Sequence, residues 1–242
     1  NEQTGTGILA LSTFGPVTAG LGYFNNTNLN NSSEINLTQG LGLDAFPNGA
    51  NGVINGGQDV YVATVQGDLD FVKLEAWYLG HQENFTSYTL AATSNIDIAE
   101  NAKIGLEARY VNLKLTNDAR KGIASSINTL VGTGYTADDF ESKNDMFRLA
   151  VDGKFSIVNA RLAYTKTGKD GGLTALDQDA KNTSLGWAIT SNGAVDADYF
   201  QAALGADILD NLNFTLHYGQ LKSKEDANAT KIRILTDDIK AK

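Results

Sequence analysis

The side chains best suited to chemistry in this sequence are a few carboxylates and two histidines. Asp138, Asp139 and Glu141 form an acidic group, and Ca²⁺ prefers clustered oxygen ligands of this kind. A solvated acidic loop explains the same three residues without a metal. His81 and His217 stand apart with no second ligand nearby in the sequence, so a histidine metal pair is not expected. Calcium is therefore the only cofactor that the sequence suggests.

No motif in the sequence predicts an enzyme. The Gly-x-Gly runs at 5–7 and 20–22 are not followed by a helical pattern, so a phosphate-binding loop is not expected. The chain has no cysteine, which excludes disulfides, thiolate metal sites and a cysteine nucleophile. A carboxylate pair for glycoside hydrolysis stays open, because barrel enzymes exist, but nothing in the sequence places two carboxylates at the required separation of roughly 5–9 Å. We expect a protein without catalytic residues.

Composition limits the class of partner. The 242 residues carry a net charge of −9, and phosphate binding needs a basic face, so no nucleic-acid partner is expected. Only 19% of residues are charged, while 25 are glycine and 2 are proline. No run of 18 strongly apolar residues suggests a membrane helix.

Strict alternation of apolar and polar residues is the strongest pattern in the chain, and it predicts β-strands. Five segments repeat one design, in which an apolar stripe ends in a tyrosine on the same face. They span 17–23, 72–78, 104–110, 158–164 and 212–218. The five tyrosines that end these stripes are expected at one level of the sheet: Tyr23, Tyr78, Tyr110, Tyr164 and Tyr218.

The opposite face of these strands and of their partners is polar and carries full charges in mid-strand. If this face lines a water-filled lumen, its mixed charges would set a transverse field that acts on small ions. Alternatively, these side chains only pair across strands within the wall. The candidate pore-lining residues are Lys73, Glu75, Glu107, Arg109, Arg148, Asp152, Lys154, Arg161, Gln201 and His217.

Partner strands running the other way complete an expected set of eleven. We place them near 5–13, 58–66, 85–93, 145–155, 198–208 and 230–236. Short links precede the tyrosine-ending strands, including one at 95–101. Most links that follow the tyrosines are long: 25–57, 116–144 and 168–197, with helical pieces expected at 124–130 or 177–185.

These features favour a transmembrane antiparallel up-and-down β-barrel over a soluble β-sandwich. Strands of about ten residues cross a bilayer at a tilt of about 45°, whereas soluble strands more often have about five or six residues. A ring of tyrosines at one level is typical of an aromatic girdle, and long loops at one end with tight turns at the other are typical of outer-membrane barrels. In a barrel the tyrosine face would contact lipid, whereas in a sandwich a second sheet would cover it. An outer-membrane barrel that acts as an adhesin through its loops is a further alternative.

Several segments resemble one family, the Campylobacter-type major outer membrane protein, a porin of ε-proteobacteria. Thr4-Gly5-Thr6-Gly7, later followed by Gly22-Tyr23-Phe24, is similar to the stretch after that family's inward loop. Lys73 to Tyr78 and Ala108-Arg109-Tyr110 resemble its strands, as does Gln201 to Ala206 followed by Asn213-Phe214. The match is one of order and spacing over most of the chain and includes no sharp motif.

The resemblance implies an 18-stranded trimeric porin of the bacterial outer membrane, with a preference for cations and an inward loop that narrows the pore. Its partners would be outer-membrane lipid or lipopolysaccharide, small hydrophilic solutes and ions. Measured against that family, the chain would be a single barrel domain, incomplete at both ends, with most of the constriction loop outside it. We therefore expect about eleven strands of a larger barrel and passive diffusion through it.

Overall fold

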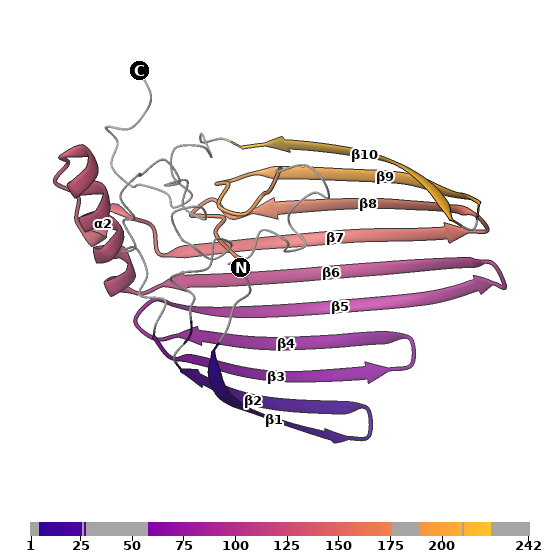
Figure 1. Ribbon diagram of the computed structural model, residues 1–242, viewed down its shortest axis with the longest axis horizontal. Coiled ribbons are helices and arrows are strands. Elements are labelled where there is room, and N and C mark those ends of the chain that lie inside the picture. Colours follow the sequence, from indigo (N-terminus) through magenta and orange to yellow (C-terminus); the bar gives the residue numbers. More distant parts are fainter. Residues whose placement is uncertain (1–4, 26, 28–57, 176–188, 210, 224–242) are drawn as a thin grey trace.

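The structure is a computed structural model that describes residues 5–25, 27, 58–175, 189–209 and 211–223. Ten strands form one antiparallel sheet in which each strand pairs with the next in chain order (Figure 1). This confirms the predicted all-β, up-and-down class. The strands are β1 (Thr6–Phe14), β2 (Val17–Asn25), β3 (Val60–Leu69), β4 (Val72–His81), β5 (Phe85–Ala99), β6 (Ala102–Leu115), β7 (Lys143–Phe155), β8 (Val158–Thr167), β9 (Asp198–Leu209) and β10 (Leu212–Lys222).

The two ends of the sheet differ as the sequence predicts. Tight turns join β1 to β2, β3 to β4, β5 to β6, β7 to β8 and β9 to β10, and all lie at one end (Figure 1). The first of these turns contains Gly15, whose φ of 57° is the left-handed conformation that glycine adopts without strain. Longer connections lie at the other end, which we call the long-loop end. There the connection between β6 and β7 forms helix α2 (Asn117–Val131) and the 3₁₀ turn η1 (Ala137–Asp139).

Strand register places all five tyrosine stripes on one face, which we call the outer face. Tyr23 pairs with Tyr61, Tyr78 with Tyr88, and Tyr110 with Phe147 along neighbouring strands. The apolar side chains of this face are exposed rather than packed against a second layer; Leu21 is 69% exposed and Leu216 is 61% exposed. Burial of the kind that a β-sandwich requires is therefore missing from the outer face of the described strands.

The described residues contain one cluster of buried apolar side chains, and it lies at the long-loop end. Ile123 and Ile127 of α2 pack with Phe85, Leu113 and Leu115, which point away from the tyrosine face. The helix thus covers the opposite, inner face at the long-loop end of β5 and β6. Helix α2 starts after Thr116, whose side chain accepts a hydrogen bond from the backbone N–H of Ala119, and it ends at Gly132 in the left-handed conformation.

Two boundaries differ markedly from those predicted. Strand β5 continues to Ala99, so most of the link expected at 95–101 is strand, and only residues 100–101 form the turn. Helix α2 begins at Asn117, about two turns before the helical piece expected at 124–130. The strand expected at 230–236, which would make an eleventh, and the helical piece at 177–185 lie outside the described residues. Within the described residues, no helix is long and apolar enough to span a membrane.

Candidate pore-lining face

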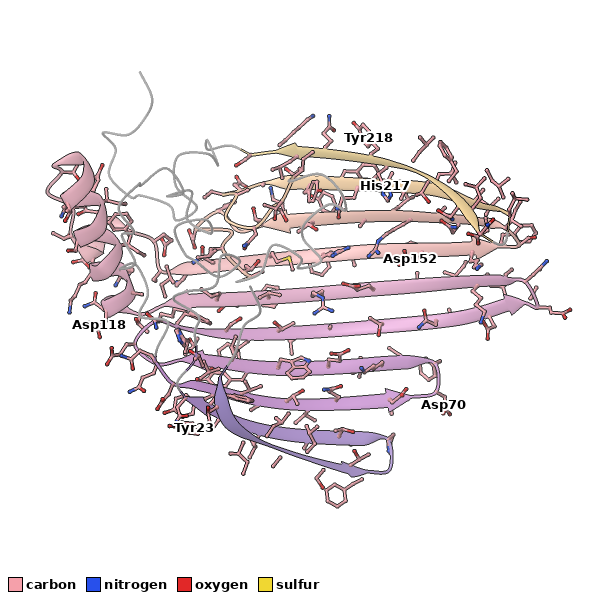
Figure 2. The ribbon with its side chains drawn as sticks, in the orientation of Figure 1. Tyr23, Asp70, Asp118, Asp152, His217 and Tyr218 are labelled. Atoms are coloured by element: carbon pink, nitrogen blue, oxygen red, sulfur yellow. The ribbon has the colours of Figure 1, made fainter. Side chains whose placement is uncertain are left out.

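All ten candidate pore-lining residues lie on the inner face, opposite the tyrosines. In register, Arg109 lies beside Arg148, Asp152 beside Arg161, and Ala203 beside His217. Figure 2 labels Asp152 and His217 on strands β7 and β10. Alternation therefore predicted the face of each of these side chains correctly.

On β4, Glu75 is held by two neighbours on the same strand. The Lys73 ammonium lies 3.2 Å from one carboxylate oxygen of Glu75, and the Trp77 indole N–H donates to the other at 2.9 Å. Residues two apart on a strand share a face, so the three side chains form a row along the inner wall. The carboxylate is thus oriented by one charged and one neutral donor.

Charges are most crowded on β6 and β7. The Arg109 Nε lies 3.1 Å from a carboxylate oxygen of Glu107, and the side chain of Glu107 is only 8% exposed. Arg109 and Arg148 lie directly opposite each other, which brings two guanidinium groups to the same level. Arg148 is 2% exposed, so it is covered by other parts of the protein even though it lies on the predicted face.

Ion pairs nearer the tight turns are open to water. Arg161 Nε lies 3.5 Å from Asp152 Oδ1, and Lys154 Nζ lies 3.8 Å from Asp207 Oδ2. The inner face of the described strands carries equal numbers of the two signs. The acidic members are Asp68, Glu75, Asp97, Glu107, Asp152 and Asp207, and the basic members are Lys73, Lys103, Arg109, Arg148, Lys154 and Arg161.

Described parts of the connection between β8 and β9 fold onto the inner face at the long-loop end. Tyr199 is fully buried there and donates a hydrogen bond to the carbonyl of Ile189 at 3.2 Å. The Asn144 side chain accepts from the backbone N–H of Leu173 at 3.0 Å, and Asn192 accepts from two backbone N–H groups, those of residues 174 and 175. These contacts hold both flanks of the connection against the inner wall.

Sequence reasoning missed these contacts. Tyr199 departs from the pattern of the tyrosine stripes, because it is a large aromatic residue on the inner face, where Thr165 and Leu221 are its cross-strand neighbours. That irregularity is a usable signal that another segment covers the position. Asn144 and Asn192, which hold the connection through side-chain amides, carry no signal that distinguishes them from ordinary loop residues.

The metal candidates do not converge. Asp139 accepts hydrogen bonds from the backbone N–H and the hydroxyl of Thr136, and Glu141 accepts from two backbone N–H groups that follow it. Asp138 is almost fully exposed. His81 is buried and its Nδ1 lies 2.8 Å from the Asn84 amide. Among the described residues, no group of three or more metal-ligating side chains is gathered.

The outer face carries a nearly continuous aromatic row just below the long-loop end. Ring centroids lie 5.4 Å apart for Tyr23 and Tyr61 and 5.2 Å apart for Tyr78 and Tyr88. The hydroxyl of Tyr23 donates to Asp59 at 2.9 Å, toward the long-loop end (Figure 2). The apolar band below this row and the polar groups above it have the pattern of a membrane-facing wall.

Comparisons with known proteins place this geometry in one class of fold. No family model and no curated protein matches the sequence. Among solved structures, OprD from Pseudomonas aeruginosa matches with a TM-score of 0.60 and 15% identity over 93% of this chain and 53% of that one. The fold is that of an outer-membrane porin wall. OccK1 (OpdK) from the same organism matches with a TM-score of 0.64 and 14% identity over 90% of this chain and 53% of that one.

A third Pseudomonas aeruginosa structure, OccK5 (OpdH), matches with a TM-score of 0.61 and 14% identity over 93% of this chain and 56% of that one. The chain therefore spans about half the length of the proteins that it resembles in structure. These comparisons support the general part of the resemblance described above, an outer-membrane porin fold, but not the Campylobacter-type family in particular.

Proposed function

We propose that this protein forms the wall of an outer-membrane porin and that ions and small polar solutes diffuse passively along its inner face. One observation carries the proposal. The same ten strands expose an apolar face that no other described part of the chain covers, and they present a charged face on the other side. Such a sheet is stable only between lipid and water, and in lipid its edges must be paired, which a closed barrel achieves.

The proposal includes a weak preference for cations, set at the mouth of the channel rather than by the wall. Charges on the inner wall balance, whereas the described loops at the long-loop end hold eight acidic and three basic residues. The acidic ones are Asp59, Glu83, Asp118, Asp138, Asp139, Glu141, Asp170 and Asp196, and the basic ones are Arg120, Lys121 and Lys169. An acidic mouth raises the local concentration of cations over about one Debye length, roughly 8 Å at physiological salt.

Assembly as a trimer of closed 18-stranded barrels is the finer part of the proposal, and the sequence resemblance is its support. An exposed apolar outer face would also supply the surface on which subunits meet. Native mass spectrometry of the detergent-solubilised full-length gene product would show three copies if this part of the proposal holds, and a single copy would contradict it.

Planar-bilayer recording tests the channel itself. The full-length gene product should give stepwise openings, and under a salt gradient its reversal potential should have the sign of a cation preference. Glu107→Lys should shift that potential toward anions and Arg109→Glu toward cations, because both side chains lie on the inner face. Lys114→Gln is the matched control, since Lys114 lies on the outer face.

The results separate the alternatives. If no openings appear from correctly folded protein, the adhesin hypothesis gains and the porin proposal fails. Openings whose selectivity is the same in both charge-reversal variants would retain the channel but remove Glu107 and Arg109 from ion selection.

A further inference from the structure

Two lysines stand directly opposite each other on the outer face, above the aromatic row. Register pairs Lys114 of β6 with Lys143 of β7, four residues beyond the paired Tyr110 and Phe147. Both lysines are exposed. Like charges placed directly opposite on neighbouring strands destabilise a sheet, so this pair needs a partner of opposite sign.

The protein does not supply that partner within the described residues. No described carboxylate lies within 4.0 Å of either ammonium group, in contrast with Lys166 on the same outer face. Lys166 Nζ lies 2.8 Å from Asp196 and 3.2 Å from Asp198, which neutralise it. One outward lysine is thus paired internally, while two others face each other and the exterior.

The neighbouring charged groups do not change this conclusion. Asp145 shares the outer face with Lys143, but its carboxylate lies against Gly168, directly after the end of β8. Asp118, at the start of α2, is paired with Lys121 at 3.1 Å. On the β5 side, the row continues to Thr86, a neutral hydroxyl that could donate to an anion bound by the lysines.

The height of the pair identifies the kind of anion. Four residues of strand rise about 13 Å, or about 10 Å of height at a tilt near 45°. The polar region of one leaflet is roughly 5–8 Å thick, and lysine side chains can reach back toward it along their flexible stems. The two ammonium groups can therefore reach back along their stems to the level of the lipid phosphates.

We propose that Lys114 and Lys143 form a binding site for the phosphate groups of an anionic outer-leaflet lipid, with one phosphate bridging both ammonium groups. Thr86 lies at the edge of the site. The inference rests on the proposed outer-membrane location and adds a lipid site on the side of the wall that faces away from the pore. Free phosphate offers the same chemistry, and the experiment distinguishes the two sources.

The test uses the full-length gene product folded in detergent, with lipid A as the probe. Binding is measured by native mass spectrometry for the wild type, for Lys114→Gln combined with Lys143→Gln, and for Lys166→Gln as the control. The double variant should bind lipid A about 30-fold more weakly, given the contribution of each lysine to attraction by an anionic surface. The control should bind like the wild type, and phosphatidylcholine should bind weakly to all three proteins.

Each other outcome overturns the lipid site. Equal lipid A affinity in the double variant and the wild type would show that the lysines do not hold phosphate. Displacement of lipid A by millimolar inorganic phosphate, with free phosphate bound as tightly, would make the site one for a soluble anion. Channel openings of the double variant should match those of the wild type, because both lysines face away from the pore. A failure of the lipid site with normal openings therefore leaves the porin proposal intact.

Discussion

The two faces of this sheet are built by alternate residues of the same strands, yet they follow opposite rules. On the outer face, the apolar side chains of Leu106 and Leu149 are exposed. On the inner face, Glu107 and Arg148, which are charged, are buried. In a water-soluble protein the first arrangement favours aggregation and the second costs desolvation energy. The difference teaches that the solvent on each side, rather than the depth within the protein, decides which residue type each face can hold.

The inner face is itself divided along the strands. At the long-loop end of β5 and β6 it is apolar and lies under α2, where Leu113 and Leu115 pack against Ile123. Nearer the tight turns it is charged and open, as at Asp97 and Lys103. Under the helix, the inner wall at the long-loop end is therefore part of a protein core. The part nearer the tight turns remains a surface in contact with water.

A charge placed on each face in turn gives the largest expected effect. Leu106→Arg puts a guanidinium in the middle of the apolar band and should lower the free energy of unfolding in lipid bilayers by about 2–4 kcal/mol. Asn95→Arg puts the same group at nearly the same height on the inner face, where the side chain is exposed beside Gly105. It should change stability by less than about 0.5 kcal/mol.

Urea titration of the refolded protein in lipid vesicles measures both variants. Equal losses for the two substitutions would mean that both faces meet the same solvent, and the assignment of outer and inner faces would be wrong.

An intermediate effect is expected where the helix covers the inner face. Thr116→Ala removes the hydroxyl that caps α2 and also donates to the carbonyl of Glu83. The helix should open more easily by about 1 kcal/mol, which raises hydrogen exchange of its first-turn amides about five-fold. Thr129→Ala is the matched control, because that hydroxyl only donates to the carbonyl of Ser125 within the exposed part of the helix.

Exchange that rises equally in both threonine variants would indicate that α2 is held by packing alone, without a contribution from its cap.

The smallest effect should come from the open part of the inner face. Asp97→Asn removes the ion pair with Lys103, whose ammonium lies 3.2 Å from the carboxylate and which, like Asp97, is mostly exposed. Exposed pairs of this kind contribute about 0–1 kcal/mol and are screened by salt. Urea titration at low and high salt should show a loss below about 0.5 kcal/mol that disappears at high salt. A loss that persists at high salt would place this pair in a drier environment than the structure shows.

Much of the fold could be predicted from alternation alone. A repeat of two residues both indicates a strand and tells which face of the sheet each side chain occupies. The face of Asp152 and of His217 follows directly from that period. Strand ends were harder to predict: Asn95 and Asp97 are turn-forming residue types, yet β5 runs through them. Their pairing with Gly105 and Lys103 outweighs local preference, and no local signal reveals it.

Whether each inner side chain is buried or exposed could not be predicted from the sequence. Periodicity predicts that Arg148 faces inward, but it does not predict that this side chain is only 2% exposed. The start of α2 could have been predicted, because Thr116 followed by Asp118 is typical of a helix N-terminus. The inward fold of the connection between β8 and β9 depends on side-chain amides such as Asn192, whose partners are set by tertiary structure.

Strand order from β1 to β10 follows the chain without a single crossover. Every hairpin therefore meets only its neighbours in sequence, and the tyrosine-ended repeat recurs once in each. Because the diameter of a barrel grows with the number of its strands, a gene encoding such a wall can gain or lose one hairpin and change the width of the barrel while leaving the other hairpins unchanged. The circumference of such a wall can therefore change through inherited gains or losses of hairpins, in steps of two strands.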